Sequence, residues 1–429
     1  MAAAVHAGPM APRLGVLLSL VVVLLVLTGC ARHAGPAQEV APGHLLRPTH
    51  KAVISSPVAY DWDGDGRLEI AIGSWDGYFY LLDADLGILP GWPRYSPRGY
   101  FGSPALADLD GDGLPEIIVG SDAGRLHAWR HDGSELPGFP VALGFRNWAT
   151  AAILPGPRLV IGGLRRTLVL DAVGQAVPGW PQPMPNWSDC GPAVGPDVIA
   201  LTTLLVGPKT RGALLAWHWD GRPYPWSPLE LAMDSDSSPA LADLDGDGRV
   251  EIIVGGDEGL LHVVDLDGRP LPGFPTRAES LIEASPAVAD MDGDGRLDIV
   301  VGSWDGRMYV WDAHGQPLPG WPVQVADQII SSAALVDLDG DDRLDIVAGS
   351  KDGRLYGWTA TAQSLPGFPY NLGHHVFSSP WVGDLEGDGR ADIVVGANNG
   401  VHVLRDVGPL GRAPWPMFRR NPERTGALE

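Results

Sequence analysis

A short acidic sequence occurs six times in this 429-residue chain and sets the spacing of the rest. Its first copy, Asp61-Trp62-Asp63-Gly64-Asp65-Gly66-Arg67-Leu68-Glu69, has carboxylates at positions one, three, five and nine and glycines at four and six. Alternate side chains of such a turn point inward, and the glycines let the backbone fold around a hard, oxygen-seeking cation. Position seven would add its backbone carbonyl. The pattern therefore predicts six cation-binding loops.

The predicted ligands occupy positions one, three, five, seven and nine of each loop. They are Asp61, Asp63, Asp65, Arg67, Glu69; Asp108, Asp110, Asp112, Leu114, Glu116; Asp243, Asp245, Asp247, Arg249, Glu251; Asp290, Asp292, Asp294, Arg296, Asp298; Asp337, Asp339, Asp341, Arg343, Asp345; and Asp384, Glu386, Asp388, Arg390, Asp392. Two copies depart from the pattern. Asp342 replaces the glycine at position six, and Glu386 replaces aspartate at position three. We expect these two sites to be the weaker ones.

The loops recur every 47 residues, except for one gap of 135 residues between Asp108 and Asp243. The gap has room for two further units, and a recurring Pro-Gly-aromatic-Pro turn locates both. These units carry Pro155-Gly156-Pro157 and Gly195-Pro196 where the acidic loop would stand, so neither is expected to hold an ion. Eight units in tandem, all but one of the successive starts 47 residues apart, indicate a repeat architecture.

Each unit has the pattern of four short strands and no helical periodicity. In the fifth unit, small residues at 238–243 lead into the loop, and the β-branched run 251–255 is typical of a strand buried on both faces. A strand at 260–265 and a more polar last strand follow. The sequence predicts an all-β fold, an eight-bladed β-propeller of 47-residue, four-stranded repeats over residues 44–408, with a tail over 409–429 packed on it.

The units resemble the FG-GAP/VCBS repeats of integrin α-subunit propellers and their bacterial relatives. The shared features are the Asp-x-Asp-Gly-Asp-Gly loop, an apolar strand ending in Gly-Ser, the aromatic-Pro turn and the tail sequence 415–421. The resemblance covers residues 44–429 and implies Ca²⁺ in up to six loops, each joining the first two strands of a blade. It implies little about activity.

The first 29 residues have the features of a secretory signal: Arg13, then an apolar run over 14–27, then small residues. Leu27-Thr28-Gly29-Cys30 resembles the lipobox of bacterial lipoproteins, which implies lipidation of Cys30 and a tether over 30–43. Because Ala31 is not acidic, we expect an exported bacterial lipoprotein at the outer membrane or cell surface, held by its lipid anchor only. The alternative is an ordinary signal peptide with a chance cysteine. Cys190 then has no partner, and we expect it to be buried and inert.

The formal net charge of −22 and the lack of a basic stripe argue against nucleic acid as a partner. Side chains of the six loops account for 24 of the 52 acidic residues, so much of the charge serves ion binding. We expect a monomer whose partner is a protein or a glycan.

The residues three places before each unit should ring one mouth of the channel, on the face opposite the loops. They are Ile54, Phe101, Trp148, Asp189, Asp236, Glu283, Ile330 and Phe377. Five adjacent units contribute apolar groups and the other three contribute carboxylates. Of these, Phe101, Trp148, Asp189, Asp236, Glu283 and Phe377 are the candidate ligand-binding residues. Alternatively, they only cap the first strands.

No catalytic motif stands out. The 12 histidines are scattered, no serine stands in a nucleophile elbow, and the strong carboxylate clusters belong to the loops. We therefore expect a protein- or glycan-binding and adhesion module. A polysaccharide lyase resembling rhamnogalacturonan lyases is the first alternative. An outer-membrane assembly scaffold is the second.

The repeat phase also predicts how the ring closes. Leu45 to Val53 lies almost where the fourth strand of a unit would precede unit one, so this segment should pair on the outer edge of the last blade. The tail would then pack across a face or a neighbouring turn, and removal of residues 423–429 should be mild.

Overall fold

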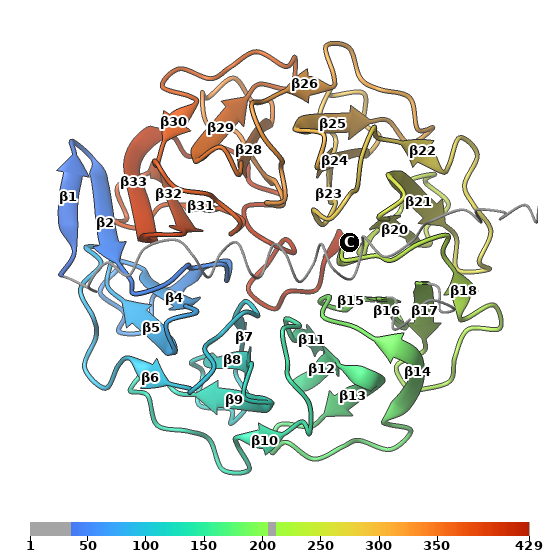
Figure 1. The fold of residues 1–429 in the computed structure, drawn as a ribbon, viewed down its shortest axis with the longest axis horizontal. Helices are drawn as coiled ribbons and strands as arrows, with labels where there is room; N and C mark the ends of the chain where they lie inside the picture. Colours follow the sequence, from blue (N-terminus) through green and yellow to red (C-terminus); the bar gives the residue numbers. More distant parts are fainter. Residues whose placement is uncertain (1–35, 205–211, 429) are drawn as a thin grey trace, which may run out of the picture.

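The computed structural model describes residues 36–204 and 212–428 and forms a ring of eight β-sheets around a central channel (Figure 1). Each sheet is one antiparallel blade of four strands, and two blades gain a fifth. The predicted all-β, eight-bladed propeller is therefore confirmed. No helix in the described part of the chain is long and apolar enough to cross a membrane.

The first strand of each blade is three residues long and lines the channel. These strands are β3 (Val58–Tyr60), β7 (Ala105–Ala107), β11 (Ala152–Leu154), β15 (Ala193–Gly195), β19 (Ala240–Ala242), β23 (Ala287–Ala289), β27 (Ala334–Val336) and β31 (Trp381–Gly383). Alanine dominates because eight strands crowd around one axis and larger side chains would collide.

The second strands are almost wholly buried, which explains their Ile- and Val-rich sequences. They are β4 (Glu69–Gly73), β8 (Glu116–Ser121), β12 (Arg158–Gly162), β16 (Val198–Thr203), β20 (Glu251–Gly255), β24 (Asp298–Gly302), β28 (Asp345–Gly349) and β32 (Arg390–Ala397).

The third and fourth strands complete each blade toward the rim. The third strands are β5 (Tyr78–Leu82), β9 (Arg125–Trp129), β13 (Leu164–Leu170), β17 (Ala213–Trp217), β21 (Leu260–Val264), β25 (Arg307–Trp311), β29 (Arg354–Trp358) and β33 (Gly400–Pro409). The fourth strands of blades one to seven are β6 (Arg94–Tyr95), β10 (Val141–Ala142), β14 (Gln182–Trp187), β18 (Leu229–Glu230), β22 (Thr276–Arg277), β26 (Val323–Gln324) and β30 (Tyr370–Asn371).

Tryptophans of the aromatic-Pro turns join neighbouring blades. The indole nitrogens of Trp92, Trp180 and Trp321 donate to carbonyls 39 residues further along the chain, at 2.7 to 3.1 Å. Each ring is less than a tenth exposed. These tryptophans therefore act as wedges between blades, which is why the turn recurs with the repeat.

The N-terminal segment closes the ring as the repeat phase predicts. β2 (His44–Pro48) pairs antiparallel with β33 and is the fourth strand of blade eight. The strand ends at Pro48, five residues earlier than the predicted segment. β1 (Gln38–Ala41) adds a fifth strand outside it, so the last part of the predicted tether is ordered in a hairpin (Figure 1).

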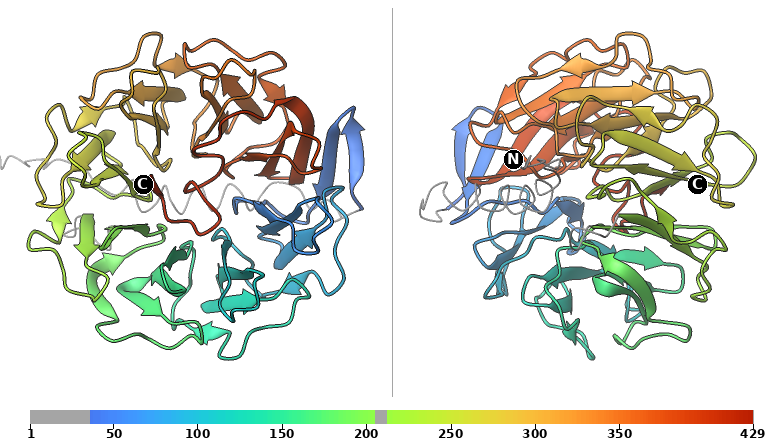
Figure 2. Two further views of the ribbon diagram at one scale, coloured as in Figure 1. Left: turned by 180° about the vertical axis from the view of Figure 1, so that it is seen from behind. Right: turned by 45° about the vertical axis from the view of Figure 1, so that its right-hand side comes forward.

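The C-terminal tail runs through the channel instead of lying on the surface (Figures 1 and 2). Its final strand, β34 (Ala427–Leu428), pairs parallel with β19. Backbone bonds also join the tail to the first strands of other blades. They link Leu106 to Pro422, Ile153 to Glu423, Val194 to Thr425, Leu335 to Trp415 and Val382 to Pro416. The tail is therefore a plug shared by most of the ring.

Two arginines of this plug are fully buried. The Arg424 guanidinium donates to the carbonyls of Pro57 at 2.8 Å and Pro104 at 2.8 Å, and Arg419 donates to those of Pro192 and Pro239. Both are at most 2% exposed. The expectation that loss of residues 423–429 is mild does not fit these contacts, because it would strip partners from buried carbonyls.

Residues 1–35, which include the predicted signal peptide and Cys30, lie outside the described part of the chain.

Candidate functional site

The first acidic loop brings its carboxylates together. Oxygens of Asp61, Asp63, Asp65 and Glu69 all lie within 4.8 Å of one another. Asp61 accepts the N–H groups of Gly64 at 2.7 Å and Gly66 at 3.0 Å, which holds the turn closed. A cluster of oxygen donors on a glycine-rich turn is the ligand chemistry that Ca²⁺ prefers.

Four other loops bring three carboxylates within the same distance. The groups are Asp108, Asp110 and Glu116; Asp243, Asp245 and Glu251; Asp290, Asp292 and Asp294; and Asp337, Asp339 and Asp345. The remaining predicted side-chain ligands of these loops are Asp112, Asp247, Asp298 and Asp341, which lie in the same turns outside the tight groups. The carboxylate oxygens that these described loops bring together fit a divalent cation.

The carboxylate at position nine is buried in every loop. Glu69 accepts the N–H of Trp62 through one oxygen at 2.7 Å. Burial, together with the neighbouring carboxylates, raises the pKa of Glu69 to about 7, despite that hydrogen bond. The same causes raise the pKa of Asp345 to about 7. A divalent cation would offset the repulsion that these values reflect.

Asp342 keeps the loop geometry that glycine has elsewhere. Its φ of 65° lies in the left-handed region, as does Gly66 at 86°, and its N–H still donates to Asp337 at 3.1 Å. The backbone is strained at this residue, because a non-glycine residue rarely adopts this φ. The turn itself is unchanged.

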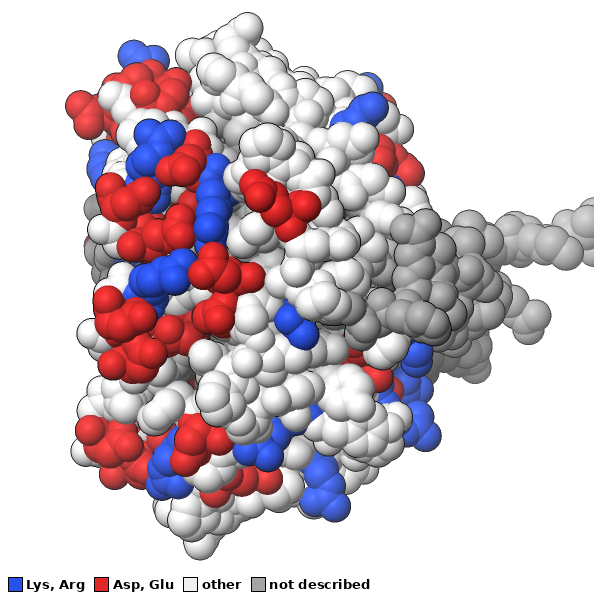
Figure 3. Space-filling view, turned by 90° about the vertical axis from the view of Figure 1, so that its left-hand side faces the viewer, with Lys and Arg blue, Asp and Glu red and all other residues white. Residues whose placement is uncertain are grey.

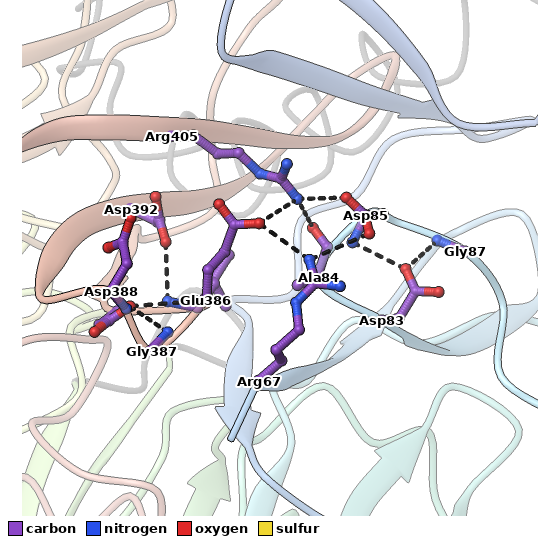
Figure 4. A network of polar contacts seen from close by, with 12 residues as sticks. Arg67, Asp83, Ala84, Asp85, Gly87, Glu386, Gly387, Asp388, Asp392 and Arg405 are labelled. Carbon is purple, nitrogen blue, oxygen red and sulfur yellow. Dashed lines mark hydrogen bonds and ion pairs between the residues drawn. The ribbon is translucent and has the colours of Figure 1, made fainter. Parts of the chain in front are cut away.

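The eighth loop is arranged differently (Figure 4). Glu386 turns toward Arg67 at 3.0 Å and Arg405 at 3.3 Å, away from the other carboxylates of its loop. Asp384 instead accepts four backbone N–H groups, which lower its pKa against the opposing effect of burial. Among described residues, this loop forms no tight carboxylate group.

The loops all follow a first strand, so they lie on one face of the disc. A space-filling view shows acidic side chains in a band along one face, with Lys and Arg between them (Figure 3). Arg130 contributes to that mixture by pairing with Asp110 of the second loop.

At the other end of the first strands, all eight residues of the predicted mouth line one cavity of about 180 Å³. The structure brings together Phe101, Trp148, Asp189, Asp236, Glu283 and Phe377, with Ile54 and Ile330 completing the ring. Phe418 of the plug also lines it. The cavity is therefore a blind pocket at the channel mouth.

Below the mouth, hydroxyl groups from seven blades form the hydroxyl girdle, which links each blade to the next except blade three to blade four. Each hydroxyl oxygen accepts a backbone N–H from the preceding blade at 2.9 to 3.2 Å. The girdle consists of Ser56, Ser103, Thr150, Ser238, Ser285, Ser332 and Ser379. Blade four has Gly191 at this place, where a Cβ would lie 3.0 Å from Cδ of Arg419.

The acidic side of the mouth brings three carboxyl groups into one small space. Burial, Asp236 and Glu283 raise the pKa of Asp189 well above its usual range. Burial and Asp236 raise the pKa of Glu283 to about 8, although Trp304 donates to that carboxylate at 2.7 Å and Lys351 opposes the shift. Cys190 beside them is a buried free thiol whose pKa burial raises, as expected for an inert cysteine.

The opposite side of the mouth is a wall of aromatic rings. Phe101 and Trp148 stack with their centroids 4.8 Å apart, and Trp75 and Trp187 extend the row at 5.6 Å on either side. The Trp148 indole nitrogen donates to Asp122 at 2.8 Å, which fixes the ring.

Two stretches, residues 61–119 and 290–348, match the family model of the FG-GAP-like repeat. Both begin at an acidic loop and span the strands described above. The chain is an FG-GAP-repeat β-propeller. None of the curated proteins matches this FG-GAP propeller at a significant level.

Solved structures share the fold of the FG-GAP propeller. The computationally designed Ika8 protein is 17% identical over 84% of this chain and 98% of its own, with a TM-score of 0.59. BamB from Moraxella catarrhalis is 16% identical over 81% and 95%, with a TM-score of 0.55. The V. cholerae biofilm matrix protein Bap1 is 12% identical over 92% and 95%, with a TM-score of 0.55. At these identities the likeness shows the fold alone.

Sequence reasoning missed two parts of the FG-GAP propeller's cavity, its floor and its girdle. The floor, Phe418, comes from the tail, and no periodic signal places a tail. The girdle had a signal, since seven of the eight units carry Ser or Thr at the same place. Small residues before the first strands are also expected from close packing around the channel, so this pattern alone does not predict the hydrogen bonds of the girdle.

Proposed function

We propose that this FG-GAP propeller is a calcium-stabilised binding module, anchored to the cell envelope through Cys30, that takes its ligand at the channel mouth. The observation that supports this most is the blind cavity itself. Residues from every blade converge on it, and its walls differ in chemistry from one side to the other. A packing role alone would not require three carboxylates facing one small space.

Calcium is the ion we assign to the loops. Five of them offer oxygen donors at close range, and extracellular modules bind Ca²⁺ with dissociation constants of about 10⁻⁴ to 10⁻³ M. The eighth loop would bind the ion more weakly or not at all, because Glu386 is engaged by two arginines.

Charge argues against the lyase alternative at this cavity. The substrate of such an enzyme is a polyanion, and the described residues that line the cavity include three carboxylates and no Lys, Arg or His. A polyanion would add to the repulsion among these carboxyl groups and finds no cationic partner among the described lining residues. We therefore propose a binding protein and not an enzyme.

The proposed location in the cell envelope rests on the resemblance of residues 27–30 to a lipobox. We propose a monomeric lipoprotein at the outer membrane or cell surface. The fold is shared with a biofilm matrix protein and with BamB, which leaves both adhesion and assembly roles compatible with it. Metabolic labelling with a palmitate analogue tests the anchor: the label should enter the chain and be lost in Cys30→Ala.

A glycan and envelope-protein screen of the full-length protein in detergent, with and without calcium, tests the function. Binding should be lost in Asp236→Asn combined with Trp148→Phe, a change that keeps a ring in the stack on Phe101. Release of unsaturated sugars would support the lyase instead. A ligand that binds both variant and wild type equally would refute the mouth as the site.

A further inference from the structure

We infer that the channel mouth takes an uncharged sugar ring at the end of a glycan chain. This inference rests on the proposed binding function and specifies the chemistry of its ligand. Three features of the cavity carry it: a side of aromatic residues, a side of carboxyl groups, and the hydroxyl girdle below both.

The aromatic side of the cavity suits the C–H surface of a sugar ring. Trp75, Phe101, Trp148 and Phe377 all line the cavity. The stacking of Phe101 on Trp148 and the bond from the Trp148 indole to Asp122 hold this side in place before any ligand arrives. Large, rigid aromatic side chains bury apolar surface at a low cost in conformational entropy, so a preformed wall favours a ligand with an apolar flank.

The carboxyl side offers hydrogen bonds. Glu283 of blade six lies opposite Phe101 of blade two, and Asp189 of blade four lies in the same half of the ring as Glu283. Burial and Asp236 raise the pKa of Glu283 to about 8, and the same two causes raise the pKa of Asp189. At neutral pH these two carboxyl groups therefore hold protons, and each can donate as well as accept. A sugar hydroxyl also does both, which makes the groups matched partners.

A charged ligand would find no matching partner in the cavity. The described lining residues include no Lys, Arg or His for an anion. An ammonium group would meet two carboxyl groups that hold protons, and Asp236 already has a partner within the chain. Because burial of a charge without an oppositely charged partner is costly, the cavity selects an uncharged ligand.

The hydroxyl girdle excludes a purely apolar ligand. Its seven hydroxyl-bearing residues are between 4 and 8% exposed, and each hydroxyl oxygen already accepts one N–H. Within the described residues none of their protons has an acceptor. An apolar ligand would leave these donors unsatisfied, whereas the ring and hydroxyl oxygens of a sugar accept from them.

The shape of the cavity selects a chain end. Phe418 and the plug close it below, and a volume of about 180 Å³ is smaller than the 300 Å³ or more typical of drug-sized sites. A blind pocket of this size admits one sugar residue. The interior of a polysaccharide would need a groove open on both sides.

Binding of three matched pairs of β-1,4-linked tetramers to the full-length protein in detergent and calcium tests the inference. The uncharged probes are the tetramers of glucose, mannose and N-acetylglucosamine, and their charged counterparts are those of glucuronate, mannuronate and glucosamine. Trp75 and Trp148 provide a fluorescence signal at the cavity, and calorimetry gives the affinity. We expect an uncharged tetramer to bind at least about tenfold more tightly than its charged counterpart.

Glu283→Leu removes both the donor and the acceptor and should weaken binding of that tetramer at least about tenfold. Glu283→Gln should restore most of the affinity, because an amide donates and accepts as the protonated carboxyl does. Glu279→Leu is the matched control: Glu279 belongs to the same segment, but it is exposed, pairs with Arg307 and does not line the cavity. The control should bind as the wild type does. The comparison of tetramers on the wild type needs no variant and remains decisive if Glu283→Leu folds poorly.

An uncharged tetramer that binds no better than its charged counterpart would overturn the inference, as would failure of all three uncharged tetramers to bind. So would affinity in Glu283→Gln as low as in Glu283→Leu, because the ligand would then require the charge of a carboxylate. A charged glycan or an envelope protein that binds the wild type and is lost in Trp148→Phe with Asp236→Asn would refute the uncharged sugar and leave the proposed function standing.

Discussion

The two faces of the disc both concentrate carboxylates, but they do so by different means. On the loop face, one turn of nine residues holds its carboxylates within 4.8 Å, and glycines and backbone N–H groups fix the turn. At the mouth, the three carboxylates come from different blades and face aromatic rings. The comparison shows that local turn geometry builds sites for small ions, whereas the ring builds a pocket for a larger group.

Removal of calcium should have the largest effect. An ion bound only by the native state stabilises it by about 2.7 kcal/mol at one hundred times its dissociation constant, so several loops together contribute on the order of 10 kcal/mol. A chelator should lower the melting temperature by about 10 °C or more. Magnesium in place of calcium is the control. An unchanged melting temperature, or fewer than four ions per chain at millimolar calcium, would contradict the assignment.

Removal of residues 423–429, in the plug between the faces, should rank second. It eliminates β34 and the Arg424 guanidinium, and charge-assisted hydrogen bonds contribute about 1.5–3 kcal/mol each. We expect a loss on the order of 5 kcal/mol in calcium, measured by denaturant unfolding. Removal of Glu429 alone is the control. A truncated chain with the stability of the wild type would show that the plug is not needed for the ring.

The two termini show how far a repeat sequence predicts structure. The N-terminal strand β2 could be placed because it keeps the phase of the repeat, and a closed ring must pair its last edge. Its end at Pro48 was not predicted, although proline lacks a backbone N–H and therefore favours the end of a strand.

The tail has no phase to follow. Its sequence is irregular, and from the sequence alone Arg419 and Arg424 would be expected at the surface. In the structure both are buried and donate to carbonyls of four blades. Likewise, Glu386 at position three predicts that the eighth loop binds its ion weakly. The sequence does not predict that Arg67 and Arg405 pair with this side chain. A sequence pattern within one unit does not predict which side chains of other units will contact it.

A third prediction compares one loop with another. Asp63→Ala removes a member of the four-carboxylate group, whereas Glu386→Ala removes a side chain that no tight group includes. In calcium, Asp63→Ala should cost about 2–3 kcal/mol of unfolding free energy, the contribution of one bound ion. Glu386→Ala should cost less than about 1 kcal/mol, the value of a partly exposed ion pair.

Chelator separates the two causes in that experiment. With the ions removed, the cost of Asp63→Ala should largely vanish and that of Glu386→Ala should persist. Equal calcium-dependent losses would mean that the eighth loop binds its ion as the first does.

The smallest effect should come from charge at the mouth. Burial and the neighbouring Asp236 raise the pKa of Glu283 from its ordinary value of 4.5 to about 8, so the carboxyl holds its proton in the folded state at a pH where the unfolded chain has lost it. This stabilisation is fully present below pH 4.5 and is lost as the pH rises to about 8. In saturating calcium, the unfolding free energy of the wild type should therefore fall across this window.

Glu283→Gln does not titrate, so its unfolding free energy should fall less steeply than that of the wild type over the same window. Glu279→Gln should retain the wild-type slope, because it leaves the mouth unchanged. Thermal unfolding in calcium between pH 5 and 8 measures all three proteins. If Glu283→Gln follows the wild type at every pH, the mouth carboxylates do not repel one another, and the contrast between the two faces reduces to the loops alone.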